Sequence, residues 1–394
     1  MKPYIPVLIL LIFLAALMRD DFALTLIYLF LGAFVLGTWW SSRSLSQVKH
    51  TRKFMDRAFL GEKIEVELQL ENRGWLPLLW TRLTESLPVG LSTSPTFEQV
   101  TSLGPKTETT FHYTLSAQKR GYYPLGPSFV STGDLLGLSR PLRTEMPAEY
   151  LTVYPQIVAL KAIQIPSSAP QGTLRHTQPI FEDPTRVMGK REYVAGDSLR
   201  RVDWKSTAAT GRLQVKLFEP SISLETLIFL NLNAEDYHYR SRIDATELAI
   251  VIAASVANWV AGKRQTVGLQ VNGLDPLKPE SAPPTLPPRK GQAHLMRMLD
   301  LLARIEMTKE TSLTSLLQRE RYQLPWGTTL IVITGQAGND LLDELYQARR
   351  AGQNALLILA GPVVNEQEIL LRAGYFGIPV VPILNEHGLD LWRK

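Results

Sequence analysis

The chain has 394 residues, of which 45% are hydrophobic and 20% are charged, and its formal net charge is +5. This length is sufficient for two or three domains, each with its own core. The absence of cysteine agrees with a reducing compartment, although a cysteine-free periplasmic chain would have the same composition. Much of the positive charge lies beside the apolar N-terminal segment, so it does not indicate nucleic-acid binding, and we expect no nucleic-acid partner.

Two charge-free runs open the chain, Pro3–Met18 and Phe22–Ser42, and only Arg19, Asp20 and Asp21 separate them. The second run has 21 residues, and about 20 residues suffice to cross a hydrocarbon core of about 30 Å. The first run is marginal in length, and its alternative interpretation is a cleaved signal peptide. The second run follows at once, without a small-residue cleavage site, which favours a hairpin of two transmembrane helices over residues 1–45.

The positive charges around these runs predict the orientation of the hairpin. The loop between the runs holds one arginine, whereas Lys2 precedes the first run and several lysines and arginines follow the second. Since Lys and Arg accumulate on the cytoplasmic side, both ends of the hairpin are expected there. The sequence therefore predicts a multi-pass protein of the cell membrane, with lipid as one partner and a large cytoplasmic C-terminal part.

Residues 46–155 have the pattern of short strands. The stretch "EKIEVELQLEN" (62–72) alternates polar and apolar residues, and "TETTFHYTLSA" and "GPSFVST" follow in the same style. Turn signals such as Gly104–Pro105 and Gly126–Pro127 separate the strands. Short strands at this spacing predict an antiparallel β-sandwich domain.

The rest of the chain divides into a connector and an α/β domain. Residues 156–225 begin with a stretch rich in Pro, Ser and Thr and are expected to connect the domains. From residue 226, apolar strands such as "TLIFLNLN" and "TTLIVIT" alternate with helical patterns. One of these helices starts near Asp244, its expected N-cap, and is apolar nearly all round. This alternation predicts a doubly wound α/β domain over residues 226–394.

The motifs of common enzyme classes are missing from the sequence. It has neither a glycine-rich phosphate loop nor a nucleophile elbow. Its six histidines lie far apart, without the spacing of metal ligands. We therefore expect a non-enzymatic protein without a cofactor.

The connector ends in "GKREYVAGDSLRRVDWKSTAATGRLQVKLFE" (189–219), which is dense in charged residues. Asp197, Arg200 and Asp203 are three residues apart, so on a helical turn these side chains are neighbours, with Trp204 beside them. The first interpretation is structural: an ion-paired corner with Trp204 in the core. The second is a surface recognised by a partner protein. The candidate residues for either role are Arg191, Tyr193, Gly196, Asp197, Arg200, Asp203, Trp204 and Lys205.

An enzymatic alternative uses the same stretch. Asp197 and Asp203 are the carboxylates of the Gly196–Lys205 motif that a metal-dependent hydrolase would employ. Buried, mutually paired carboxylates would count against that alternative, whereas an open concave pocket would favour it.

This long motif resembles the signature of a bacterial membrane-associated family called domain of unknown function 58. A second stretch, "RGYYPLGPSFVSTGDLLGLSR" (120–140), is also similar to one common in that family. The resemblance implies two N-terminal spans, a sandwich and a region like a von Willebrand factor A domain. It further implies a MoxR-type AAA+ ATPase as partner, since such ATPases are often encoded beside family members.

The resemblance also makes an expectation about metal binding. Von Willebrand A domains hold Mg²⁺ with an Asp-x-Ser-x-Ser motif after the first strand and a further Asp after a later strand. The corresponding positions here are Asn231, Asn233, Glu235 and Gly335. Because a hard dication needs carboxylate and hydroxyl oxygens, we expect no metal at this degenerate site. The predicted function is that of a membrane-anchored scaffold or adaptor in an envelope-associated or chaperone-like assembly.

Overall fold

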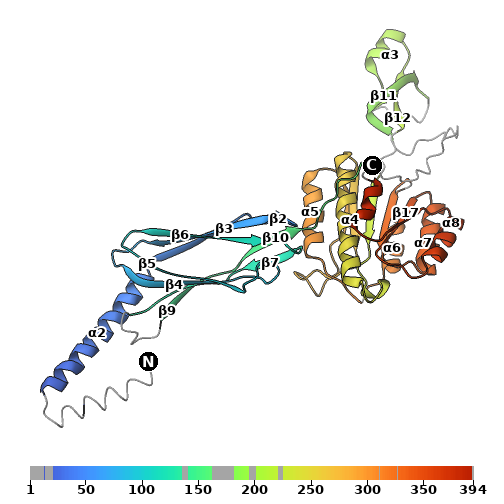
Figure 1. The fold of residues 1–394 in the computed structure, drawn as a ribbon. Helices are drawn as coiled ribbons and strands as arrows, with labels where there is room; N and C mark the ends of the chain where they lie inside the picture. Colours follow the sequence, from blue (N-terminus) through green and yellow to red (C-terminus); the bar gives the residue numbers. More distant parts are fainter. Residues whose placement is uncertain are drawn as a thin grey trace. The chain divides into compact units, whose positions relative to one another are not determined.

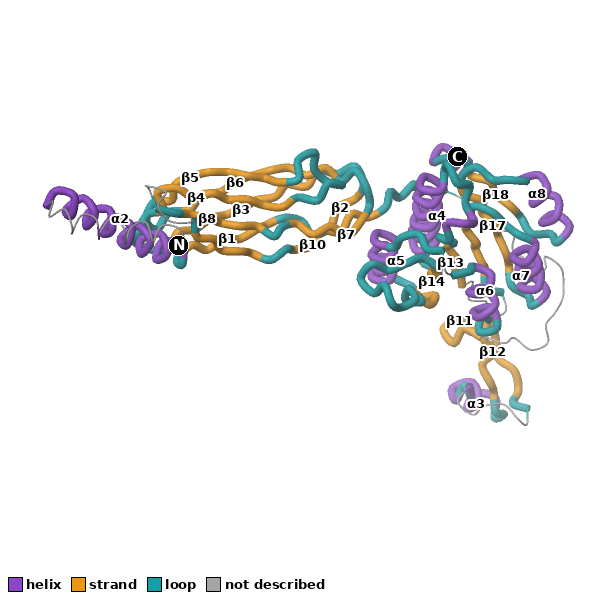
Figure 2. The backbone as a smooth tube through the Cα atoms, turned by 90° about the horizontal axis from the view of Figure 1, so that it is seen from below, coloured by secondary structure: helices purple, strands orange, loops and turns teal. Residues whose placement is uncertain are grey.

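The computed structural model describes residue 13 and residues 21–134, 141–161, 182–194, 201–220, 225–309, 311–325 and 327–392. The chain divides into two compact units near Gln156–Ile157. The first consists of an N-terminal helix and a β-rich region, and the second is built around a mixed α/β sheet (Figures 1 and 2).

The described residues include one N-terminal helix, whereas the sequence predicted two. The run Phe22–Ser42 corresponds to α2 (Asp21–Leu45), which is long and apolar enough to cross a membrane. The run Pro3–Met18 lies outside the described residues, apart from Phe13. A further helix, α4 (Arg242–Gly262), has a similar length and hydropathy, but it is largely buried and is a core helix of the α/β unit. The described residues therefore support one apolar N-terminal helix and not a multi-pass arrangement.

The β-rich region contains ten strands in three sheets. The sheet orders are β1-β3-β6, β2-β10-β7 and β5-β4-β8-β9, and all neighbours pair antiparallel except β2 and β10. The strand bounds are β1 (Val48–Lys53), β2 (Arg57–Phe59), β3 (Lys63–Asn72), β4 (Leu78–Ser86), β5 (Thr96–Leu103), β6 (Glu108–Ser116), β7 (Gly121–Leu125), β8 (Ser128–Thr132), β9 (Leu142–Met146) and β10 (Glu149–Tyr154).

Strand β3 shows why the alternating pattern forms this region. Its even-numbered apolar residues Ile64, Val66, Leu68 and Leu70 are all buried, because successive side chains of a strand point to opposite faces. The first two pack with residues of β7 and β10, and the last two pack with residues of β4 and β8. One face of one strand thus contributes to both cores of the region.

A buried ion pair links the three sheets. Arg52 Nε on β1 lies 2.5 Å from Glu85 Oε1 on β4, and both side chains are fully buried. Tyr113 on β6 donates its hydroxyl to Glu85 Oε2 at 2.8 Å, and Arg52 Nη1 lies 3.2 Å from Glu149 Oε1 at the start of β10. Burial raises the pKa of Glu85, an effect that the Arg52 charge opposes. Arg52 is therefore the counter-charge that keeps a buried carboxylate tolerable.

The α/β unit has a six-stranded sheet in the order β15-β14-β13-β16-β17-β18, parallel except for the edge strand β15. Its strands are β13 (Glu225–Leu230), β14 (Thr266–Val271), β15 (Leu286–Arg289), β16 (Thr329–Thr334), β17 (Asn354–Ala360) and β18 (Val380–Ile383). Besides α4, its helices are α5 (Gln292–Arg304), α6 (Leu313–Arg321), α7 (Asn339–Arg350) and α8 (Glu366–Tyr375), with short 3₁₀ helices η2 (Ala234–Asp236) and η3 (Glu386–Trp392).

Helices lie on both faces of this sheet (Figure 2). Helices α6, α7 and α8 pack on one face, against alternate residues such as Phe229, Val332 and Leu357. Helix α4 contacts β13, β14, β16 and β17 and is buried on nearly all sides. A strand covered on both faces needs apolar side chains in both directions, which explains the continuous apolar runs in β13, β16 and β17.

Three details of the α/β unit differ from the sequence-based expectation. Helix α4 begins at Arg242 after Ser241, so Asp244 lies in the first turn and is not the N-cap. A carboxylate is also favourable in a first turn, because of the partial positive charge of a helix N-terminus. The sequence analysis missed the four-residue edge strand β15, which lies in a Pro-rich loop, and the short helix α6.

Replacing Arg52 by methionine is expected to destabilise the protein by about 3–5 kcal/mol, because the Glu85 carboxylate then stays buried without its counter-charge. The loss should be larger at pH 8 than at pH 4.5. A carboxyl group whose pKa is raised in the folded state contributes stability below its unfolded pKa, and that contribution is lost as the pH rises through the folded pKa.

Thermal and denaturant unfolding of the full chain measure this loss. Arg82→Met is the matched control, because Arg82 of β4 pairs with Glu98 at 3.1 Å and both side chains are half exposed. Its cost is expected to be about 0–1 kcal/mol. Equal costs for the two variants would contradict the role given to the buried pair.

Candidate functional site

The strand order of the α/β sheet reverses between β13 and β16. From β13 the chain passes through α4 to β14 on one side, and it later returns to β16 on the other side. In open α/β sheets, ligands bind outside the carboxyl ends of the strands at such a point. Asn231 follows β13 there, and Thr334 ends β16.

The Asn231 side chain makes four hydrogen bonds at this point. Its Nδ2 donates to Asp236 Oδ2 at 2.8 Å and to Thr334 Oγ1 at 2.9 Å. Its Oδ1 accepts from Asn272 Nδ2 at 2.7 Å and from the Asn233 amide at 3.0 Å. We call these five residues the Asn231 cluster. Its central side chain is 1% exposed, and its hydrogen-bonding capacity is used within the cluster.

The ring of Tyr237 lies against Gly335, next to the Asn231 cluster. Its buried hydroxyl donates to the Asn231 carbonyl oxygen at 2.6 Å, and burial raises the pKa of this hydroxyl. A Cβ atom at Gly335 would collide with the Tyr237 ring and would lie 2.6 Å from the Asp236 carbonyl oxygen. The ring therefore occupies the space that a side chain at position 335 would need.

The four positions that correspond to the metal site of von Willebrand A domains differ in burial and contacts. Asn231 is buried in its cluster, and the Asn233 side chain accepts from the Glu235 amide at 3.1 Å as the N-cap of η2. Glu235 is exposed, and Gly335 lies against Tyr237. Within the described part of the chain, no three His, Asp or Glu side chains are grouped to hold a metal ion. The chemistry of the cluster is that of neutral amides and hydroxyls with one carboxylate, which is a poor ligand set for a hard dication.

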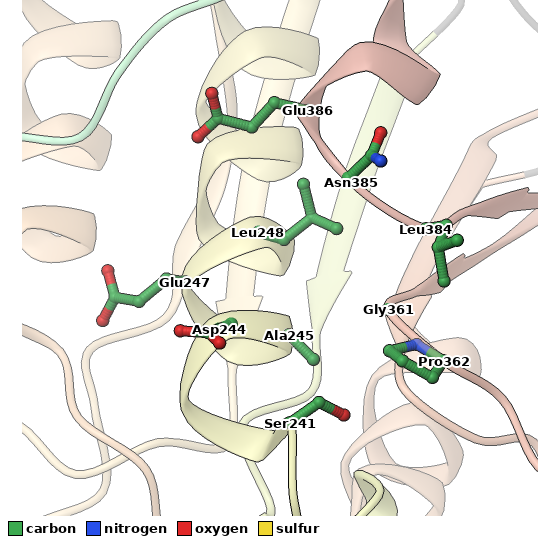
Figure 3. A pocket seen from close by; sticks show the side chains of 10 residues that line it. All are labelled: Ser241, Asp244, Ala245, Glu247, Leu248, Gly361, Pro362, Leu384, Asn385 and Glu386. Carbon is green, nitrogen blue, oxygen red and sulfur yellow. The ribbon is translucent and has the colours of Figure 1, made fainter.

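A shallow pocket of about 460 Å³ lies at the same edge of the sheet (Figure 3). The first turns of α4 contribute Ser241, Asp244, Ala245, Glu247 and Leu248, and the segments after β17 and β18 contribute Gly361, Pro362 and Leu384–Glu386. Ser241 Oγ lies 3.5 Å from the His238 carbonyl oxygen and has no contact with a base. The pocket is acidic and partly apolar, but it holds no paired nucleophile and base.

The long sequence motif folds into a hairpin with a short helix. Strand β11 (Glu182–Glu192) pairs antiparallel with β12 (Gln214–Pro220), and α3 (Trp204–Thr210) precedes β12. We call β11, α3 and β12 the signature hairpin. The Asp203 amide donates to the Gln214 carbonyl, and the Gln214 amide donates to Thr207 Oγ1, so α3 is fixed to β12.

Asp203 stabilises the start of α3 in two ways. Its Oδ1 accepts from the Ser206 amide at 3.1 Å as the N-cap, and its Oδ2 lies 2.9 Å from Lys190 Nζ on β11. These contacts, first that with Lys190, hold the pKa of Asp203 below its usual value. The Asp203 side chain is 13% exposed. Asp203 therefore positions the start of the helix through contacts within the hairpin.

The structure adds one contact to the interpretation of this corner and corrects one expectation. Asp203 pairs with Lys190, which the sequence did not indicate. Trp204 was expected in the core, but its side chain is 68% exposed, and none of the residues of α3 is buried. Gly196, Asp197 and Arg200 lie outside the described residues.

The remaining motif residues are at the surface or close to it. Arg191 and Lys205 are exposed, and Tyr193 is half-buried, with its amide bonded to the Leu213 carbonyl. The sequence analysis also missed Asn272, Thr334 and Tyr237 around Asn231. A signal for Asn272 existed: it follows β14 directly, and the carboxyl ends of neighbouring parallel strands meet at one edge.

Replacing Asn231 by aspartate is expected to destabilise the full chain by about 1–3 kcal/mol. The change removes two donated hydrogen bonds and places a carboxylate where Nδ2 now lies 2.8 Å from Asp236. Asn233→Asp is the matched control, since an aspartate caps η2 as well as an asparagine does. Unfolding measurements that found both variants as stable as the original protein would contradict the described cluster.

Comparison with known proteins gives a family and one distant relative. Residues 189–375 match the family described as "Protein of unknown function DUF58". The "Uncharacterized protein YeaD" of Bacillus subtilis (strain 168) is 25% identical over 315 residues, which cover 78% of this chain and 74% of that protein.

Two solved structures show weak similarity over about a quarter of the chain. The CARDB domain of a Pyrococcus furiosus protein gives a TM-score of 0.22 at 18% identity, covering 27% of this chain and 91% of that one. A cohesin module from Clostridium perfringens gives 0.21 at 14% identity, covering 27% and 96%. These scores carry no argument about fold or function, and the family similarity rests on the sequence match of residues 189–375 to DUF58.

Proposed function

We propose that this protein is a membrane-anchored, non-enzymatic scaffold or adaptor whose signature hairpin binds a partner protein. The observation that carries this proposal is the position of Trp204. The side chain of the preceding residue, Asp203, is engaged within the hairpin, yet the indole itself is 68% exposed. Tryptophan and arginine dominate the energetics of protein interfaces, so an indole held out on a braced corner suits recognition.

The Asn231 cluster supports a binding function over catalysis. It fills the place where a doubly wound sheet usually opens a ligand crevice, and its side chains satisfy one another. Asp203 is a candidate carboxylate of a hydrolase, but one of its oxygens pairs with Lys190 and the other accepts a hydrogen bond from the Ser206 amide. Neither arrangement offers a free acid or base, so we propose a protein without metal or cofactor.

The proposed architecture has three parts. Strand β3 contributes to cores shared by different sheets, which supports a β-sandwich over residues 46–155. The sheet order and the alternation of helices and strands support a von Willebrand A-like domain over residues 226–394. Helix α2 supports membrane anchoring. The proposal also includes a second span over the run Pro3–Met18 and a cytoplasmic position for the bulk of the chain.

The proposed partner is a MoxR-type AAA+ ATPase, as the family resemblance implies. The charge of the hairpin suits an acidic surface on that partner. Residues 182–220 contain eight lysines and arginines against six acidic residues, and the excess of positive charge lies in residues 189–217, with seven against three. Opposite charges would steer association, and the indole would supply the buried contact.

Trp204→Ala is expected to change stability by no more than about 0.5 kcal/mol, because the side chain is exposed. Loss of an interface anchor of at least about 2 kcal/mol weakens binding about thirtyfold. The measurement is the affinity of the detergent-solubilised full chain for the MoxR-type ATPase of its own host. Tyr322→Ala, which removes an aromatic ring exposed elsewhere in the α/β unit, should leave binding unchanged. Unaltered affinity after Trp204→Ala would contradict the proposed role of the hairpin.

A further inference from the structure

The last turns of α2 are fixed within the β-rich region. Trp40 Nε1 donates to the Pro77 carbonyl oxygen at 3.0 Å, and Ser41, Ser44 and Leu45 are buried. Only two residues separate α2 from β1, and the amides of both are hydrogen-bonded back to the end of the helix. The helix therefore has no flexible linker to the strands that follow it.

The positions of charged residues in α2 indicate which part of the helix would lie in the hydrocarbon core of a bilayer. About 20 residues, at about 1.5 Å each, cross a hydrocarbon core. Asp21 and the exposed Arg43 bracket the charge-free part of α2, Phe22–Ser42, which has 21 residues. Trp39 is exposed at this level, where tryptophan is typical of the membrane–water interface. Pro77, which accepts the hydrogen bond of Trp40, must then lie at the membrane surface.

Two exposed apolar side chains flank Pro77. Trp75 is 69% exposed and Leu79 is 46% exposed. Trp75 lies in the loop before β4, and Leu79 is the second residue of β4. A second contact holds this loop close to the end of α2, since the Arg73 amide donates to the Gln47 carbonyl oxygen at 3.1 Å. Large apolar side chains held this way gain stability if a partner removes them from water.

We propose that Trp75 and Leu79 insert into the headgroup and upper acyl region of the bilayer beside α2. This inference rests on the proposed membrane anchoring. The geometry points to lipid as the binding partner of these side chains. The rigid connection to α2 brings Trp75 and Leu79 to the membrane interface without the help of another protein. An amphipathic indole suits the headgroup level, and Arg43 suits an anionic leaflet surface. Trp75 and Leu79 then give the β-rich region a second attachment to the membrane besides α2.

The absence of cysteine makes a direct test possible. Trp75→Cys and Leu79→Cys are each introduced into the full chain and labelled with an environment-sensitive nitrobenzoxadiazole dye. Each protein is reconstituted into vesicles of phosphatidylcholine and phosphatidylglycerol, with or without brominated acyl chains. Both substitutions are at exposed positions, so the fold should be preserved. We expect blue-shifted emission at both positions, and strong quenching by the brominated lipid.

Two control positions separate failure of this inference from failure of the anchor. Trp39→Cys on α2 should be quenched if the helix is in the membrane at all. Val89→Cys lies just beyond the opposite end of β4, is 83% exposed, and should not be quenched. If the dye at position 39 is quenched, but the dye at position 75 or 79 is quenched no more than the dye at position 89, the inference is wrong while the membrane anchor stands. Absence of quenching at Trp39 would overturn the membrane anchor, and the inference with it.

Discussion

The hydrogen bonds of Asn231 tie together the carboxyl ends of the three central strands of the α/β sheet. The side chain reaches Thr334 at the end of β16, Asn272 after β14, and Asp236 in the segment that follows β13. The bonds to Thr334 and Asn272 are buried and the bond to Asp236 is partly buried, so loss of a buried partner would leave a polar group unsatisfied at a cost of about 1–3 kcal/mol. The cluster is therefore stable only as a complete set, and this fixes the edge of the sheet.

The closed edge constrains where the protein can act. Tyr237 takes the space next to Gly335, so the chain itself fills the edge between the ends of β13 and β16. Besides the shallow pocket at the start of α4, two surface features are fixed by hydrogen bonds. In each, a hydrogen-bonded element holds an exposed indole: α3 holds Trp204, and the loop at Pro77 holds Trp75. On our proposals, one indole binds protein and the other binds lipid.

The elements with strong periodicity were predictable from sequence. Strand β3 alternates because one face is buried, and β13, β16 and β17 are apolar throughout because helices cover both faces. Helix α4 is apolar all round because it is buried all round. Short elements without such a burial pattern, such as β15, were not predictable, since pairing with β14 and not composition makes the segment a strand.

The candidate site was less predictable, because its partners are distant in sequence. Strand pairing brings Lys190 to Asp203 from the other arm of the hairpin, a contact that spacing along a helical turn could not indicate. The same spacing placed Trp204 in the core, although a short helix on two strands has too little surface to bury an indole. Asn231 was recognised through its position after β13, but its neighbours required knowledge of the strand order.

The central claim is that the Asn231 cluster closes this edge of the sheet without a metal ion. Isothermal titration of Mn²⁺ and Mg²⁺ into the detergent-solubilised full chain tests it most directly. The account predicts no saturable binding at one ion per chain, because the oxygen atoms of the cluster are already hydrogen-bonded and position 335 has no side chain. Stoichiometric binding to the original protein that Thr334→Val abolishes would contradict it.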